Sequence, residues 1–164
     1  MRVARGGALA LLAGVTLAAG AAPGAAFLGS RAGACSLLRE REIERVLDAP
    51  VTKTKPAQPP LRASLCSWAV DGTHGGRLLA VYLARGASAK RGYEDASDVY
   101  TGAARERVTG LGRRAFYAVP VSSVYLLRDR TLVYVQNADG SGLADPVELR
   151  DDAVALARLV VGRL

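Results

Sequence analysis

Hydrophobic and polar residues alternate along much of the chain with the two-residue period of β-strands. The clearest case is the run Leu61 to Val70, in which Cys66, Trp68 and Val70 fall on one face. A glycine-rich turn at residues 71–76 separates this run from a second one, Arg77 to Ala84. The pattern predicts a β-hairpin with a long loop.

Further strands are expected on both sides of this hairpin. A short edge strand at residues 51–55 precedes a proline-rich linker at residues 56–60. Downstream, strands are predicted at residues 105–109, 115–119, 121–127 and 131–136. The last two are rich in β-branched and aromatic residues, which makes this pair the clearest hairpin in the chain.

Three segments have helical periodicity. The first is capped by Ser36 and ends near Asp48, because Pro50 disfavours helical geometry at the residue before it. A polar surface helix is expected within residues 86–101, and an amphipathic helix over residues 145–164. The order α, β, β, β, α, β, β, β, α predicts an α+β fold, in which an antiparallel, twisted sheet of about five to six strands has the N- and C-terminal helices packed on it.

The amino-terminal segment has the features of an export signal. Arg2 and Arg5 precede an uncharged stretch whose core, residues 8–22, has the length of a signal-peptide hydrophobic region. Small residues favour cleavage after Ala26, and a second possible site follows Ala34. The expected organisation is a signal peptide at residues 1–26, a linker at 27–34 and a single disulfide-closed α+β domain at 35–164.

Two other interpretations of this segment remain open. The uncharged run is long enough for a retained membrane anchor, although its glycines and Pro23 weaken that interpretation. Cys35 follows a small residue and is a possible lipidation site, but the residue three positions before it is Ala32 rather than a large aliphatic one. Membrane association is expected only if the leader is retained or Cys35 is lipidated.

Cys35 and Cys66 are the only cysteines, and no histidine or further cysteine stands near either of them at zinc-site spacing. In an exported chain, such a pair is expected to form a disulfide. The alternative is two separate buried thiols. Trp68 shares the face of Cys66 and is expected in the core, with ligand stacking as the other interpretation.

The formal net charge is +7, and almost all of the positive charge is arginine, because Lys53, Lys55 and Lys90 are the only lysines. An arginine-rich, alanine-rich and glycine-rich composition also results from a G+C-rich genome. Basicity is therefore weak evidence for a nucleic-acid partner, and we expect none.

The chain contains few residues in patterns typical of catalysis. Its single histidine, His74, stands between glycines in a predicted loop, which is a poor scaffold for a catalytic triad. Neither a nucleophile elbow nor a phosphate-binding glycine loop followed by lysine is present. We therefore expect a non-enzymatic protein without a cofactor.

Residues 137–148 match the spacing of a calcium-binding loop, from Asn137 through Asp139 to Glu148. A strand rather than a helix is expected before them. Asp145 as a helix cap, Pro146 at the first helical position and Glu148 in a capping box explain the same residues more simply, so no metal site is predicted.

The densest group of positive charge flanks the turn Gly110-Leu111-Gly112. It consists of Arg105, Arg107, Arg113 and Arg114. These residues are candidates for contact with an anionic envelope polymer or lipid headgroup. The alternative is a solvated strand edge whose charge prevents unwanted strand pairing.

Three short motifs stand out along the chain: Cys35-Ser36-Leu37-Leu38, Cys66-Ser67-Trp68, and Val108-Thr109-Gly110-Leu111-Gly112 with Ala115. Together they resemble a domain of unknown function that occurs in actinobacterial secreted proteins and lipoproteins. The resemblance implies an extracytoplasmic location, a disulfide between the two cysteines and no known catalytic residues. This chain lacks the additional lipid-bearing cysteine of many such proteins, and Arg113 stands where an acid is common; the positive patch is therefore a local feature.

Taken together, these features predict a secreted or envelope-associated, non-enzymatic binding domain whose partner is unknown and possibly anionic. The alternatives are a small extracytoplasmic hydrolase or a calcium-dependent binding protein.

Overall fold

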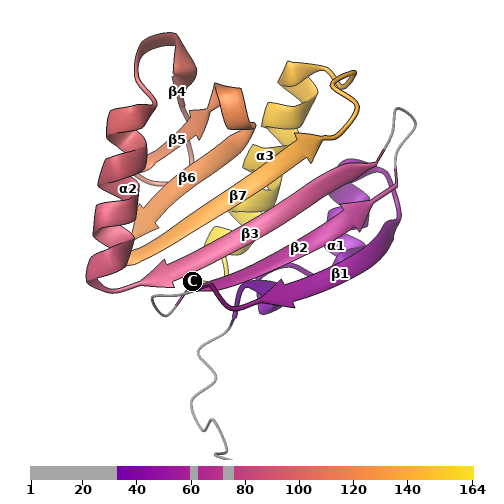
Figure 1. Ribbon diagram of the computed structural model, residues 1–164, viewed down its shortest axis with the longest axis horizontal. Helices are drawn as coiled ribbons and strands as arrows, with labels where there is room; N and C mark the ends of the chain where they lie inside the picture. Colours follow the sequence, from indigo (N-terminus) through magenta and orange to yellow (C-terminus); the bar gives the residue numbers. More distant parts are fainter. Residues whose placement is uncertain (1–32, 60–62, 72–75) are drawn as a thin grey trace, which may run out of the picture.

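The computed structural model describes residues 33–59, 63–71 and 76–164. The described part is an α+β structure built on one seven-stranded antiparallel sheet of order β1-β2-β3-β7-β6-β5-β4 (Figure 1). The strands are β1 (Val51–Ala57), β2 (Ser64–Val70), β3 (Arg77–Arg85), β4 (Arg105–Arg107), β5 (Ala115–Ala118), β6 (Ser123–Arg128) and β7 (Thr131–Asp139). The α-helices are α1 (Glu40–Leu47), α2 (Ala87–Val99) and α3 (Pro146–Val161).

The predicted fold class is confirmed, but the count of five to six strands is too low. Each of the seven strands lies at a segment where a strand was expected, but the two outer strands differ from the expectation in length. β1 runs through Pro56 to Ala57, where a linker was expected; an edge strand tolerates proline because one of its sides has no ladder to complete. β4, at the other edge, has only three residues.

Helices cover the two faces of the sheet unequally. α1 and α3 lie on one face, and α2 lies on the other face over β3, β6 and β7 (Figure 1). Alternating residues of β2 and β3, including Cys66, Trp68 and Val81, are buried beneath α1 and α3. The predicted face of Cys66, Trp68 and Val70 is thus confirmed as a core face, because all three are at most 1% exposed.

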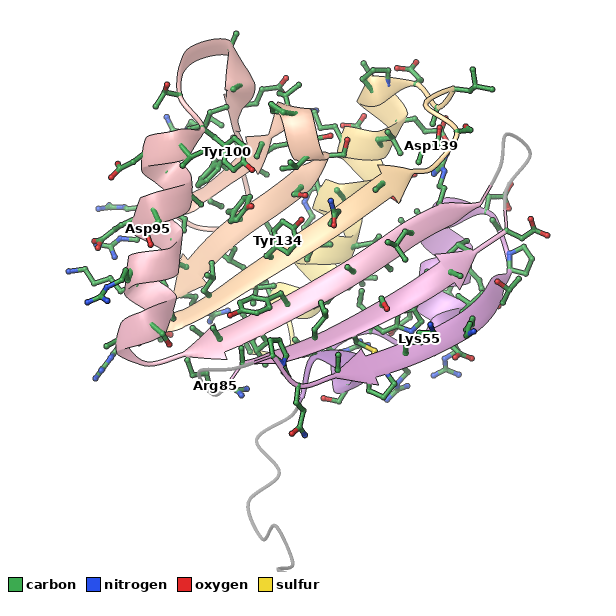
Figure 2. The ribbon with its side chains drawn as sticks, viewed as in Figure 1. Lys55, Arg85, Asp95, Tyr100, Tyr134 and Asp139 are labelled. Atoms are coloured by element: carbon green, nitrogen blue, oxygen red, sulfur yellow. A yellow bond between two sulfur atoms is a disulfide. The ribbon has the colours of Figure 1, made fainter. Side chains whose placement is uncertain are left out.

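The face beneath α2 carries a cluster of aromatic rings. Phe116 stacks on Tyr125 with a centroid distance of 5.1 Å, and Tyr93 of α2 meets the edge of Phe116 at 5.6 Å. Tyr125 also contacts Tyr100 and Tyr134, which Figure 2 labels. The predicted polar helix is therefore attached to the sheet through its few aromatic residues.

A disulfide joins Cys35 to Cys66, as the sequence predicts, with 5.0 Å between the two Cα atoms. It holds a 3₁₀ turn, Ala34–Ser36, against β2, and the Ala34 N–H donates to Ser64 Oγ at 3.0 Å. The expectation that Ser36 caps the first helix is wrong, since Ser36 belongs to this turn. α1 begins at Glu40 after Arg39, and the Glu42 carboxylate accepts a hydrogen bond from the Arg39 N–H at 2.9 Å.

The carboxyl-terminal helix begins as predicted. Asp145 accepts a hydrogen bond from the Val147 N–H at 2.8 Å, and Pro146 occupies the first helical position. Glu148 pairs with Arg77 of β3, which also binds Asp152 at 2.7 Å. Glu148 therefore attaches α3 to the sheet instead of completing the expected capping box.

Candidate functional site

The strand order brings several basic residues to one end of the sheet. β5 and β7 begin at this end, and β3 and β6 finish there. Two backbone hydrogen bonds connect the segments at this end. The Leu127 N–H donates to the Arg114 carbonyl oxygen at 2.9 Å, and the Gly86 N–H donates to the Arg130 carbonyl oxygen at 2.8 Å. The turn before β5, the β6–β7 turn and the start of α2 therefore lie side by side.

The turn before β5 is shaped by two glycines and one buried leucine. Gly110 and Gly112 have φ values of +83° and +97°, which side chains with a Cβ rarely adopt. Leu111, between them, is only 3% exposed and anchors the turn in the core. The chain then emerges at Arg113 and Arg114, both of which are exposed.

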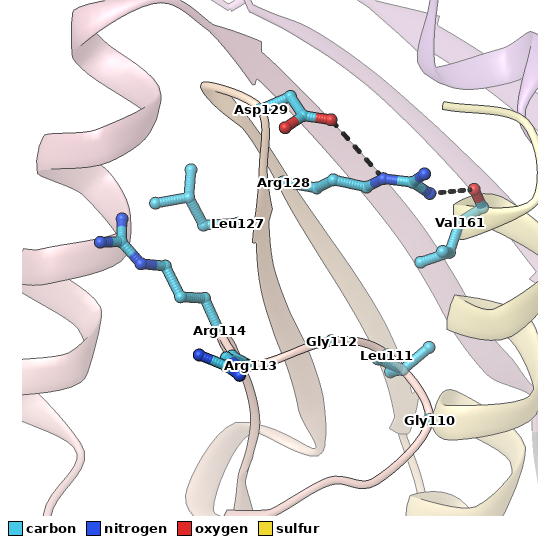
Figure 3. Close-up of a pocket in the computed structure, with 9 residues that line it drawn as sticks. All are labelled: Gly110, Leu111, Gly112, Arg113, Arg114, Leu127, Arg128, Asp129 and Val161. Atoms are coloured by element: carbon cyan, nitrogen blue, oxygen red, sulfur yellow. Dashed lines mark hydrogen bonds and ion pairs between the residues drawn. The ribbon is translucent and has the colours of Figure 1, made fainter.

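Three hollows adjoin on this part of the molecule. The hollow in Figure 3 has a volume of about 480 Å³ and is lined by the turn 110–114, the end of β6 and Val161. A second, of about 290 Å³, shares Arg114 with the first, and a third, of about 650 Å³, shares Arg113 with it. We call the charged residues that line these hollows the basic surface: Lys90, Arg105, Arg107, Arg113, Arg114, Arg128 and Arg130.

Three members of the basic surface already interact with other protein groups. Arg105 lies over the Phe116 ring at 4.3 Å and donates to Ser97 Oγ at 2.6 Å. Arg128 donates to the Val161 carbonyl at 3.2 Å and lies 3.7 Å from Asp129 (Figure 3). The third, Lys90, pairs with Glu94, its neighbour four residues along α2, at 3.6 Å.

The other four members are arginines without a carboxylate partner in the described part of the chain. They are Arg107, Arg113, Arg114 and Arg130, and all four are exposed. Asp129 is the one carboxylate among the described residues that line the three hollows. The result is a surface with a strong excess of positive charge whose guanidinium groups are available to a ligand.

The positive charge also acts on a neighbouring tyrosine. Burial raises the pKa of Tyr93, and the charges of Arg105 and Arg114 oppose this effect. Arg114 thus reaches the α2 side of the sheet, in agreement with its direction in Figure 3. The guanidinium groups of the basic surface therefore lie on both sides of β6.

The structure distributes the four predicted patch residues unequally. Arg113 and Arg114 lie at the centre of the basic surface. Arg107 lies on the edge strand β4, and Arg105 packs on the Phe116 ring of the aromatic cluster. The sequence interpretation missed Arg128 and Arg130, together with Lys90. The sequence did contain a signal for Arg128 and Arg130. In three consecutive antiparallel strands such as β5, β6 and β7, the turn between the second and third strands lies at the end of the sheet where the first strand begins.

The loop whose spacing matches a calcium-binding loop has a structural role. Asp139 ends β7, so the expected strand before the loop is present. Its carboxylate accepts hydrogen bonds from the N–H groups of Leu143 and Ala144, both at 2.8 Å, and from Ser141, and these bonds lower its pKa. Within residues 33–59, 63–71 and 76–164, no three acidic, histidine or cysteine side chains are grouped for metal binding.

Several predictions concern residues outside the described ranges. These are the signal peptide at residues 1–26, most of the linker at 27–34 and His74. Of the helices in the described ranges, none combines the length and the apolar character that a bilayer crossing requires. A disulfide between cysteines 31 residues apart is typical of an oxidising, extracytoplasmic location.

Comparison with models of protein families, with curated proteins and with solved structures found no match for this chain. The resemblance to actinobacterial secreted proteins therefore stays a prediction.

Proposed function

We propose that this protein is an exported, non-enzymatic binding domain of the cell envelope and that its basic surface holds an anionic partner. One observation carries the proposal: four exposed arginines around adjoining hollows have no carboxylate partner in the described part of the chain. Charge that serves only solubility is usually mixed in sign over the surface, whereas the described residues that line these hollows include seven cationic side chains and one carboxylate.

Two arginines elsewhere in the fold illustrate the contrast. Arg77 binds both Glu148 and Asp152, and Arg163 binds Glu42. These ion pairs connect helices to the rest of the fold. The arginines of the turn before β5 connect nothing, so their charge supports a role in binding.

The disulfide and the amino-terminal pattern support the location. The covalent bond between Cys35 and Cys66 is stable in an oxidising compartment, which an export signal would allow the chain to reach. Outside the cytosol, envelope polymers and lipid headgroups supply abundant anionic groups.

Binding to isolated cell envelopes tests this proposal. The purified, oxidised protein is sedimented with envelopes of the producing cell over a range of salt concentrations. We expect the bound fraction to fall steeply with salt, because charges are screened over about 10 Å at 0.1 M salt. The double variant Arg113→Ala/Arg114→Ala should lose most of the binding seen at low salt.

A matched control removes the same charge elsewhere. Arg41 and Arg45 are exposed on α1, which covers the opposite face of the sheet from α2. The variant Arg41→Ala/Arg45→Ala should bind like the unchanged protein. Salt-insensitive binding, or an equal loss in both double variants, would contradict the proposal.

A further inference from the structure

We infer that the ligand of the basic surface is a linear polymer of phosphate groups rather than a single small anion. This inference rests on the proposed function and specifies the partner. Its first support is the shape of the surface. The hollow of Figure 3 shares Arg113 with the largest of the three and Arg114 with the smallest, so the three adjoin one another along the ends of neighbouring strands.

The hollows are open, whereas a site for one small anion encloses its ligand. The residues that line the hollow of Figure 3 are mostly exposed, including both glycines of the turn and the three arginines. An open depression encloses little of a small anion. It can hold a chain that makes several weak contacts at once.

The positive charges are spread over four neighbouring strands. Arg107 lies on β4, Arg114 directly precedes β5, Arg128 ends β6, and Arg130 directly precedes β7. Neighbouring strands are about 4.8 Å apart, so the strands that carry these groups span roughly 14 Å. One phosphate group cannot contact charges distributed over that width, whereas successive groups of a polymer can.

Guanidinium groups suit phosphate oxygens because each offers two parallel N–H donors. All four members of the basic surface that lack a carboxylate partner within the described chain are arginines. Single-stranded nucleic acids also carry phosphates, but their binding depends on exposed aromatic rings that stack on bases. The rings nearest to the hollows, Phe116 and Tyr93, are 1% and 8% exposed, so the surface favours a polymer without bases.

A lipid bilayer fits this surface less well. Peripheral membrane proteins combine basic residues with apolar side chains that enter the headgroup region. Of the apolar residues that line the three hollows, Leu111, Phe116 and Leu127 are at most 7% exposed, and Val161 is half-buried. The surface therefore presents cations without an apolar anchor.

The test is a calorimetric titration of the oxidised protein with orthophosphate, tripolyphosphate and long-chain polyphosphate at equal phosphate concentration. We expect affinity to rise with chain length and orthophosphate to show no measurable binding. For four phosphate contacts, the logarithm of the binding constant should fall against the logarithm of salt concentration with a slope of roughly −3.

Two double variants identify the site. Arg113→Ala/Arg114→Ala should bind long-chain polyphosphate roughly 25-fold more weakly at 0.1 M salt, with the slope reduced by about 1.4. Arg41→Ala/Arg45→Ala should leave affinity and slope unchanged. Circular dichroism of both variants verifies that each is folded.

The remaining outcomes separate the inference from the proposed function. Tight, salt-sensitive binding of orthophosphate would overturn the polymer and leave an anion-binding function in place. Binding of anionic phospholipid vesicles but not of polyphosphate would assign the surface to a bilayer and overturn the inference. If the protein binds neither polyphosphate nor envelopes, both proposals are wrong. If an oligonucleotide binds more tightly than polyphosphate of equal charge, the ligand is a nucleic acid and the inference is overturned.

Discussion

Removal of the disulfide should cost the protein a large part of its stability. The bond closes a loop between residues 31 apart. In the chain-entropy description, a loop of this length restricts the unfolded chain by about 3.7 kcal/mol. Since the net stability of a typical domain is about 5–15 kcal/mol, the loss is large enough to leave a marginal fold. Both cysteines should be replaced by alanine, because Cys66 is fully buried and serine would bury an additional hydroxyl group.

Urea unfolding followed by tryptophan fluorescence measures this loss, since Trp68 lies in the core two residues from Cys66. The variant Cys35→Ala/Cys66→Ala should unfold with a free energy about 3.7 kcal/mol lower than that of the oxidised protein. For a domain covering residues 35–164, this corresponds to a melting temperature lower by roughly 13 °C. The unchanged protein treated with a reductant provides the control and should match the variant. A loss below about 1 kcal/mol in both samples would show that closing this loop contributes little to stability.

Three further predictions concern single side chains. Phe116→Ala should lower the unfolding free energy by about 3–5 kcal/mol, because the ring is 1% exposed and stacks on Tyr125; a loss below about 1 kcal/mol in urea unfolding would contradict the packing described here. The hydrogen bond from Arg163 is the main reason why the pKa of Glu42 is lowered from 4.5 to about 2. The contribution of Glu42 to the free energy of unfolding should therefore be complete above pH 4.5 and disappear as the pH falls toward 2. The free energy of unfolding of the Glu42→Gln variant should accordingly depend less on pH in this range. If it depends on pH as in the unchanged protein, the pair of Glu42 with Arg163 is not the source of that dependence. Asp139→Ala should accelerate amide hydrogen exchange in the loop before α3, whereas unchanged exchange would show that the carboxylate does not order the loop.

Local patterns in the sequence predicted the central strands well. The alternation around Trp68 identified the buried face of β2, and the β-branched run on both sides of Asp129 identified the β6–β7 hairpin. Both signals depend on residues that are close in sequence. The turn lies between the two strands as expected, although Asp129 and Arg130 adopt positive φ values of 46° and 63° without glycine.

The errors arose where distant parts of the chain decide local structure. Ser36 has the chemistry of a helix cap, but the disulfide at Cys35 holds it in a separate turn against β2. Pro56 suggested a linker, but its place on an edge strand removes the penalty. Neither the disulfide partner of a turn nor the edge position of a strand is contained in a short stretch of sequence.

The candidate site could be predicted in part. Arg113 and Arg114 were identified because they follow a glycine turn in a dense run of positive charge. Arg130 and Lys90 were not, because their proximity depends on the pairing of β3 with β7 and on the position of α2. The excess of positive charge therefore became visible only when the sheet order was known.

The intact mass of the native protein, isolated from its producing cell, shows whether the protein is exported and oxidised. We expect a chain that begins at Phe27 and is lighter by two hydrogen atoms than the same chain after reduction. A full-length chain with Cys35 and Cys66 both as free thiols would contradict the export of the protein and the closure of its fold by a disulfide.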